Sequence, residues 1–170
     1  DVMSVWKRVR QYSKEDVTSI IHGKAKHEET KATTSQATAY GTGHYLVVFN
    51  LAETDYVCDY IRGNGNKEEF MEKFANDHSD GFDPDLHLSR VGVANQTTML
   101  QSETEALQEQ IRKAILDRDG NTESYHVFDT ICGATQERQN ALFTMLEKVD
   151  QKPMDVLLVV GGYNSSNTTQ

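Results

Sequence analysis

Short apolar runs alternate with amphipathic segments along this chain, and that alternation limits the folds open to it. Runs with the length and composition of strands precede segments whose apolar residues recur every three or four positions. Strands and helices that alternate in this way form parallel sheets covered by helices, so we expect an α/β fold. The expected strands are 17–21, 45–49, 90–94, 125–128 and 154–160, and the expected helices are 2–12, 51–61, 67–77, one between Thr98 and Gly120, and one after Cys132, with a further helical turn at 28–32.

Composition limits the partners that this chain attracts. Charged residues make up 25 % of its 170 positions, and the net charge is −9. A surface of that sign has no general attraction for nucleic acid or for an anionic membrane. No apolar run approaches the roughly 20 residues that a membrane-spanning helix needs. The two cysteines, Cys58 and Cys132, form neither a C-x-x-C pair nor a disulfide framework, which is typical of a reducing compartment.

The two ends of the chain resemble cuts within a longer sequence. Asp1 is followed at once by a helical stripe with no capping residue ahead of it, and a further helix is about to begin at Asn167. We therefore expect an internal fragment. Within it, the polar stretch 121–124 is the expected boundary between two small α/β domains, the second of which begins with a βαβ unit.

Four polar loops follow expected strands, and their positions predict a shared site. In a parallel α/β sheet, ligands bind outside the carboxyl ends of the strands. Each of the loops 22–29, 95–98, 132–135 and 164–167 contains side chains that donate, accept or ligate. The coincidence of four such loops at one edge is more informative than any one of them.

His27 and Glu29 are the candidate acid–base pair. A carboxyl group at the amide-rich start of a helix, with a histidine beside it, suits proton transfer. The alternative is an ordinary solvated helix start. Thr97 and Thr98 likewise supply either site hydroxyls or plain helix-capping hydroxyls.

The loop 164–167 is a candidate anion site. It follows a Gly-Gly pair and leads into an expected helix, so its exposed amides and polar side chains suit a phosphate group. The alternative is a simple N-cap, for which serine and asparagine are the usual residues. The side chains concerned are Ser165, Ser166 and Asn167.

Cys132 lies between an expected strand and the expected helix that follows it. At the start of a helix, the dipole and the unpaired amides favour a thiolate over a thiol. The alternative is a small apolar filler, as we expect of Cys58 in the helix 51–61. Cys132 and Arg138 also satisfy C-x5-R, the spacing of a cysteine-dependent phosphatase loop. That match is weak, because the loop has a single glycine and Glu137 beside Arg138 repels phosphate.

Five stretches, 22–30, 81–84, 93–100, 130–139 and 159–168, together resemble the LytB (IspH) family of 4-hydroxy-3-methylbut-2-enyl diphosphate (HMBPP) reductases. The resemblance runs in order and with matching spacing along the whole chain, and the segment 56–84 resembles the longer plant and cyanobacterial branch. It implies Rossmann-like αβα domains, three in number, arranged as a trefoil around a central [4Fe-4S] cluster. Residues 1–124 would be the second domain and 125–170 the start of the third, with the first domain absent from this fragment.

The resemblance also implies a reaction and its residues. The reaction is the reductive dehydroxylation of HMBPP to isopentenyl and dimethylallyl diphosphates, the last step of the methylerythritol phosphate route to isoprenoids. The implied electron donor is ferredoxin, and the implied location is the plastid stroma or, alternatively, the cytoplasm of a cyanobacterium. The implied residues are Glu29 as proton donor with Thr97, the substrate-binding His27, Thr97, Thr98, Ser165, Ser166 and Asn167, and the cluster ligand Cys132, one of three cysteine ligands.

Two features depart from the family pattern. Gly133 stands where relatives usually carry Asp or Tyr, and the chain starts with Asp1-Val-Met-Ser4. Two interpretations therefore stay open: the middle of an active reductase, or a non-catalytic diphosphate-binding relative that keeps the 164–167 site. A single cysteine cannot hold a cluster, so we expect the isolated chain to be inactive.

Overall fold

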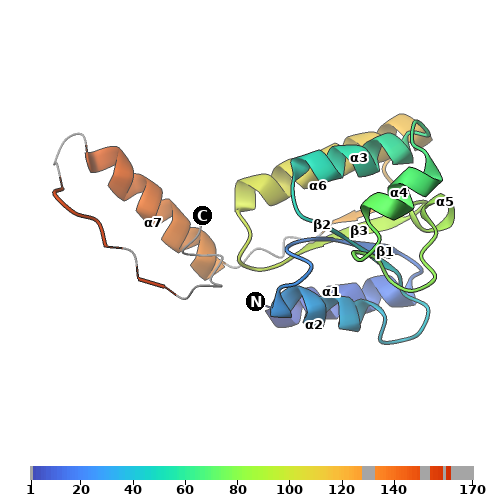
Figure 1. Ribbon diagram of the computed structural model, residues 1–170, viewed down its shortest axis with the longest axis horizontal. Helices are drawn as coiled ribbons and strands as arrows, with labels where there is room; N and C mark the ends of the chain where they lie inside the picture. Colours follow the sequence, from blue (N-terminus) through green and yellow to red (C-terminus); the bar gives the residue numbers. More distant parts are fainter. Residues whose placement is uncertain (1, 128–132, 150–153, 159, 162–170) are drawn as a thin grey trace.

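The computed structural model describes residues 2–127, 133–149, 154–158 and 160–161 of the chain. Within them, parallel strands form a sheet in the order β2-β1-β3-β4. Helices cover both faces of this sheet (Figure 1), so the predicted α/β class is confirmed. The strands are β1 (Thr18–His22), β2 (Tyr45–Val48), β3 (Val91–Asn95) and β4 (Tyr125–Val127).

The two helix layers lie on opposite faces of the sheet (Figure 1). On one face, α1 (Val2–Lys14) and α2 (Glu28–Ala37) pack together and against β1. On the other face, α3 (Leu51–Ile61) packs against α6 (Gln101–Asp119) over the larger core. Because both faces are covered, β1 and β3 are buried along their whole length, including the polar Ser19 and His22 of β1.

The segment between α3 and β3 covers the outer edge of β2. His78 forms an isolated antiparallel bridge with Leu46, in which the Val47 N–H donates to the Asp77 carbonyl at 2.6 Å. This segment carries α4 (Lys67–Lys73) and α5 (Pro84–His87). The helix predicted for 67–77 is therefore too long, because residues 74–76 form a turn and Asp77 bonds to β2.

Two other sequence expectations need correction. The loop predicted at 81–85 contains the start of α5, because Asp83 caps that helix by accepting the Asp85 N–H and Pro84 suits the first turn. The stretch 95–98 does not cap α6: Asn95 ends β3, and α6 begins after Leu100, which makes no side-chain capping bond. The predicted end of α6 is confirmed, since Gly120 has a φ of +74° and forms a left-handed C-cap.

The chain beyond residue 124 agrees only partly with the expected βαβ unit. β4 pairs in parallel with β3 and so extends the first sheet, and α7 (Gly133–Val149) is the predicted helix. The strand predicted at 154–160 is absent from the described part of that segment, because no described strand lies beside it to pair with. Residues 128–132 lie outside the described residues, so the domain boundary at 124 stays a prediction.

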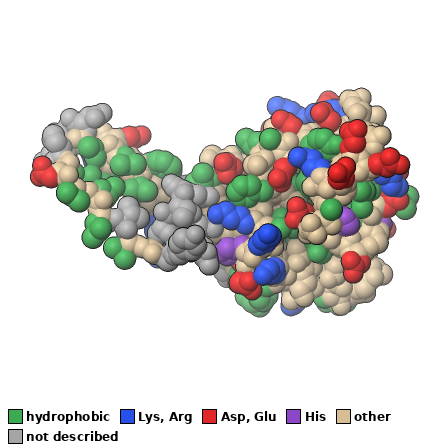
Figure 2. All heavy atoms as spheres, viewed as in Figure 1, with side chains coloured by type: hydrophobic (Ala, Val, Ile, Leu, Met, Phe, Trp, Pro, Cys, Tyr) green, Lys and Arg blue, Asp and Glu red, His purple; other side chains and the backbone are tan. Residues whose placement is uncertain are grey.

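Several large apolar side chains of α7 are exposed. The exposed fraction of Phe143 is 55 %, and that of Leu158, in the segment after α7, is 81 %. Figure 2 shows apolar side chains gathered over α7 and this segment, apart from the mixed charges over the sheet domain. Within the described residues, no helix is long and apolar enough to cross a membrane.

Candidate functional site

The order of the strands creates a switch point between β1 and β3. These strands are neighbours, but α2 leaves β1 toward one face of the sheet and α6 leaves β3 toward the other (Figure 1). Ligands of open α/β sheets bind at such a point, outside the carboxyl ends of the strands. Two of the four predicted loops, 22–29 and 95–98, meet here, because His22 pairs with Asn95 at the strand ends.

Glu29 and Thr97 join the two loops. The backbone N–H of Thr97 donates to Glu29 Oε1 at 2.6 Å, and the Thr97 hydroxyl donates to Glu29 Oε2 at 3.0 Å. Both side chains are half-buried, so the pair is fixed by the protein and still borders solvent. A carboxyl group hydrogen-bonded to a hydroxyl is the arrangement needed to pass a proton to a third group.

His27 begins the helix that carries Glu29. It is the N-cap of α2, and its Nδ1 accepts the Glu29 backbone N–H at 3.2 Å. Because a backbone N–H only donates, Nδ1 acts here as the acceptor, and the ring is left with Nε2 for other partners. The predicted pair therefore lies within one helical turn, and the predicted helix start with carboxylates in its first turn is confirmed.

Sequence reasoning missed Gln96, which lies between the two threonines and the strand. Its side chain is fully buried and donates to the Thr98 hydroxyl at 2.6 Å. Its carbonyl oxygen accepts the Lys24 backbone N–H and the Thr30 hydroxyl, each at 3.1 Å. The signal was available in the sequence, since a glutamine directly after a buried strand must find partners inside the protein.

His22 was also missed as a structural residue of this edge. It is completely buried at the end of β1, and its Nδ1 lies 2.8 Å from the Thr104 hydroxyl of α6. The same Thr104 hydroxyl lies 3.2 Å from the Leu100 carbonyl, so Thr104 joins His22 to the first turn of α6. Burial lowers the pKa of His22 to about 4, and the Phe49 backbone opposes this only in part. The imidazole is therefore neutral at pH 7 and ties β1 to α6.

The described residues offer no metal centre. Among them, no three His, Cys, Asp or Glu side chains are placed to hold a metal ion. Cys58 is buried in the core, and burial raises the pKa of its thiol to about 12, so it suits the predicted packing role and not a thiolate ligand. Cys132 lies outside the described residues, as do Ser165, Ser166 and Asn167. Their predicted roles stay predictions.

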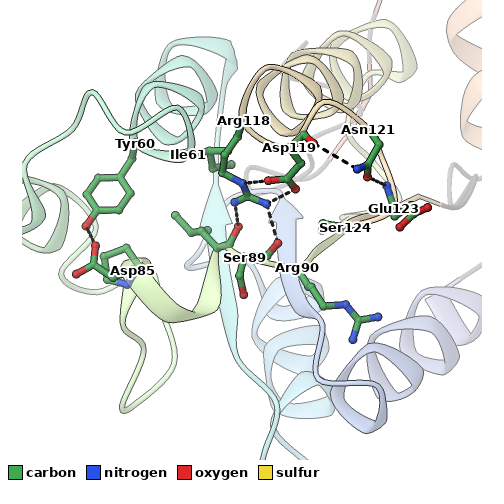
Figure 3. A pocket seen from close by; sticks show the side chains of 12 residues that line it. Tyr60, Ile61, Asp85, Ser89, Arg90, Arg118, Asp119, Asn121, Glu123 and Ser124 are labelled. Carbon is green, nitrogen blue, oxygen red and sulfur yellow. Dashed lines mark hydrogen bonds and ion pairs between the residues drawn. The ribbon is translucent and has the colours of Figure 1, made fainter.

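A hollow lies at the opposite edge of the sheet, near the starts of β3 and β4 (Figure 3). Its volume is about 660 Å³. Arg118 closes one side by donating to the Leu88 and Ser89 carbonyls and to the Asp119 carboxylate. Because these bonds engage its Nε and both terminal nitrogens, Arg118 acts as a structural clamp, and we place the candidate site at the other edge.

The fold and the polar groups at the switch point define a class: an α/β protein with a carboxyl–hydroxyl pair between two βα units. The comparisons then give the family. The model of the LytB protein family matches residues 1–170, and the chain belongs to that family.

Named relatives share half of its sequence. HMBPP reductases from Crocosphaera subtropica and Synechococcus sp. (strain RCC307) are 54 % and 53 % identical to it over 171 residues, which is 99 % of this chain and 40 % of each relative. The chain thus spans well under half the length of these relatives. The chain also aligns with a solved structure of (E)-4-hydroxy-3-methyl-but-2-enyl diphosphate reductase, the terminal enzyme of the non-mevalonate pathway. The TM-score is 0.52 at 22 % identity, and the alignment covers 99 % of this chain and 45 % of that chain. This likeness supports the fold.

Proposed function

We propose that this chain supplies the proton-delivering part of an HMBPP reductase. The observation that carries the proposal is the Glu29–Thr97 pair, which joins two βα units at the switch point of a LytB family member. The reaction breaks the C–O bond of the allylic hydroxyl. Two electrons and two protons are consumed: one proton leaves with the hydroxyl as water, and the other goes to carbon, giving isopentenyl or dimethylallyl diphosphate.

The chain's own residues would hold and move a proton. Glu29 Oε2 and the Thr97 hydroxyl oxygen are 3.0 Å apart, so a proton on the carboxyl has a direct path to the hydroxyl. His27 begins the same helical turn, and in our proposal its Nε2 faces the substrate. The substrate's diphosphate would bind Ser165, Ser166 and Asn167, by resemblance to the family.

The iron–sulfur cluster belongs to the same proposal. By resemblance to the family, Cys132 is the ligand that this chain would contribute, and the other cysteines would come from outside it. Bound there, the cluster would supply the two electrons. Ferredoxin as their source, and the plastid stroma or a cyanobacterial cytoplasm as the compartment, rest on the branch resemblance alone.

A chimera tests the proposal. The chain replaces the matching 171 residues of the Crocosphaera subtropica reductase, and HMBPP-dependent oxidation of a reduced dye is measured without oxygen. Glu29→Gln should lower turnover by about 100-fold or more, as expected for a lost general acid, while the cluster absorption is retained. Glu28→Gln is the matched control, because the Glu28 carboxylate is exposed and forms an ion pair with Lys31, and it should keep full turnover.

Two results would contradict the proposal. Full turnover by the Glu29→Gln chimera would remove Glu29 as proton donor. A folded chimera that binds HMBPP but shows no turnover would favour the non-catalytic diphosphate-binding relative instead.

A further inference from the structure

Gln96 occupies a position from which one side chain reaches both loops of the site. Its exposed fraction is zero. The amide oxygen accepts from Lys24 in the loop after β1 and from Thr30 in α2, and the amide nitrogen donates to Thr98 in the loop after β3. It therefore bridges the same two βα units as the Glu29–Thr97 pair, but through side-chain groups inside the protein.

The hydrogen-bond partners of Gln96 determine the positions of its amide oxygen and nitrogen. The Lys24 backbone N–H can only donate, so the atom facing it is the acceptor Oε1, and Nε2 must face Thr98. The hydroxyl oxygen of Thr98 then accepts, and its proton is directed to a different group. Gln96 thus occupies one lone pair of the Thr98 hydroxyl and leaves the Thr98 proton for another acceptor.

The surrounding backbone is shaped to this side chain. A Cβ atom on Gly23 would lie 3.0 Å from Gln96 Cβ, 3.2 Å from Gln96 Oε1 and 2.9 Å from the Thr30 hydroxyl. Glycine is needed at position 23 because the loop passes directly over the Gln96 amide. In addition, the Gln96 backbone N–H donates to the His22 carbonyl at 2.8 Å, so the side chain starts from a fixed backbone position.

We propose that Gln96 is a positioning residue of the reductase site: its amide holds the loop after β1 and α2 against Thr98 and directs the Thr98 proton toward the substrate. The inference rests on the proposed function. Gln96 itself touches no substrate in this scheme. It acts through Thr98 and through the placement of the Glu29–Thr97 pair beside it.

Gln96→Glu in the chimera is the decisive variant, because it preserves shape and changes one donor. When the introduced carboxyl is protonated, it still donates to Thr98; when it is ionised, it accepts, and Thr98 must turn its proton away from the site. We expect kcat/KM close to that of the unmodified chimera at low pH and at least 10-fold lower at high pH. The new alkaline fall should be absent from the unmodified chimera.

Two further variants separate positioning from folding. Gln96→Met removes the amide and should lower kcat/KM at every pH without creating the new titration. Gln101→Glu makes the same chemical change on the partly exposed start of α6, where Gln101 contacts Glu105, and should leave the pH profile unchanged. Thermal unfolding of each variant reports whether the domain is folded.

The outcomes distinguish a failure of the Gln96 role from a failure of the proposed reductase function. If Gln96→Glu has the same kcat/KM and the same pH profile as the unmodified chimera, the positioning role is overturned. A loss of activity in Gln96→Glu that is the same at every pH would overturn it too. If the unmodified chimera has no turnover while the Crocosphaera subtropica reductase is active, the proposed function fails, and this inference fails with it.

Discussion

Glu29 and Thr97 are 68 positions apart, yet both oxygens of the Glu29 carboxylate accept hydrogen bonds from Thr97. The two residues belong to loops that follow adjacent parallel strands, and only the pairing of β1 with β3 brings them together. One of the two bonds uses a backbone N–H, which no substitution at position 97 other than proline removes. Mutation can therefore test only the hydrogen bond from the Thr97 hydroxyl to Glu29.

Replacing Thr97 with valine removes the hydroxyl but keeps the backbone bond and the side-chain shape. Because Glu29 then retains its position and loses its route to the substrate, we expect turnover of the chimera to fall about 10- to 100-fold with little change in melting temperature. Thr97→Ser keeps the hydroxyl and should retain most activity. Equal turnover in the valine and serine variants would show that the hydroxyl carries no proton.

His22 makes the stability of the fold depend on pH. Its pKa is lowered by burial from 6.5 to about 4, so the unfolded chain binds a proton more readily than the folded chain. Stability should be highest above pH 6.5 and should fall between pH 6.5 and pH 4, by about 3 kcal/mol at most from this residue. Urea unfolding across this range measures it. His22→Gln should flatten the dependence, and an unchanged slope in that variant would assign the effect to other groups.

Gly92 should tolerate no side chain. A Cβ atom there would overlap the ring of Tyr12, a buried residue of α1 whose hydroxyl donates to the Val93 and His126 carbonyls. Gly92→Ala should therefore cost about 1–3 kcal/mol of unfolding free energy through overpacking. Gly120→Ala is the comparison, since a Cβ atom at Gly120 meets nothing within 4 Å and strains only the backbone. A smaller loss at Gly92 than at Gly120 would contradict this reading of the packing.

Two stacked histidines should make the cover over β2 sensitive to acid. The rings of His44 and His87 are 3.6 Å apart, and His87 Nδ1 accepts the Asp83 backbone N–H. Burial, and then the neighbouring His87, lower the pKa of His44, while Asp16 opposes the shift. The contact is therefore favoured above pH 6.5 and weakens as pH falls.

Hydrogen exchange measures this weakening in the segment 77–87. Exchange there should accelerate below pH 6.5, after correction for the intrinsic pH dependence of exchange, and His44→Phe should reduce the acceleration because the stacked ring remains but the charge of His44 is removed. Exchange rates in α6 are the internal control. An acceleration that His44→Phe leaves unchanged would exclude the stack as its cause.

Local sequence patterns predicted the helices whose ends have capping residues. The helix from Leu51 to Ile61 matches its prediction at both ends, since Asn50 accepts the Glu53 N–H as the N-cap, and Gly120 ends α6 as predicted. The run 30–37 gave a weaker signal because it is rich in threonine and serine, yet α2 continues to Ala37. Burial of Thr33 and Ala37 against α1 overrides the low local propensity.

The sequence predicted which loops form the candidate site, but not the hydrogen bonds that connect them. Strand-end logic correctly placed the loops of Glu29 and Thr97 at one edge, because parallel strands put their carboxyl ends together. It could not give Gln96 its role, since a buried amide is recognised only when its partners from Lys24, Thr30 and Thr98 are in place. Nor could it show that β4 would extend the first sheet, because strand order is decided by packing between distant segments.

The bridge between Leu46 and His78 has a consequence for how this protein behaves at high concentration. An open edge strand presents a row of N–H and C=O groups to which a second molecule can add a strand, and this is a common beginning of aggregation. Here the Val47 N–H is engaged by Asp77 and the Tyr45 carbonyl by Ser79. A deletion that removes residues 74–80 would expose this edge, and the shortened protein should self-associate through β2 where the intact chain does not.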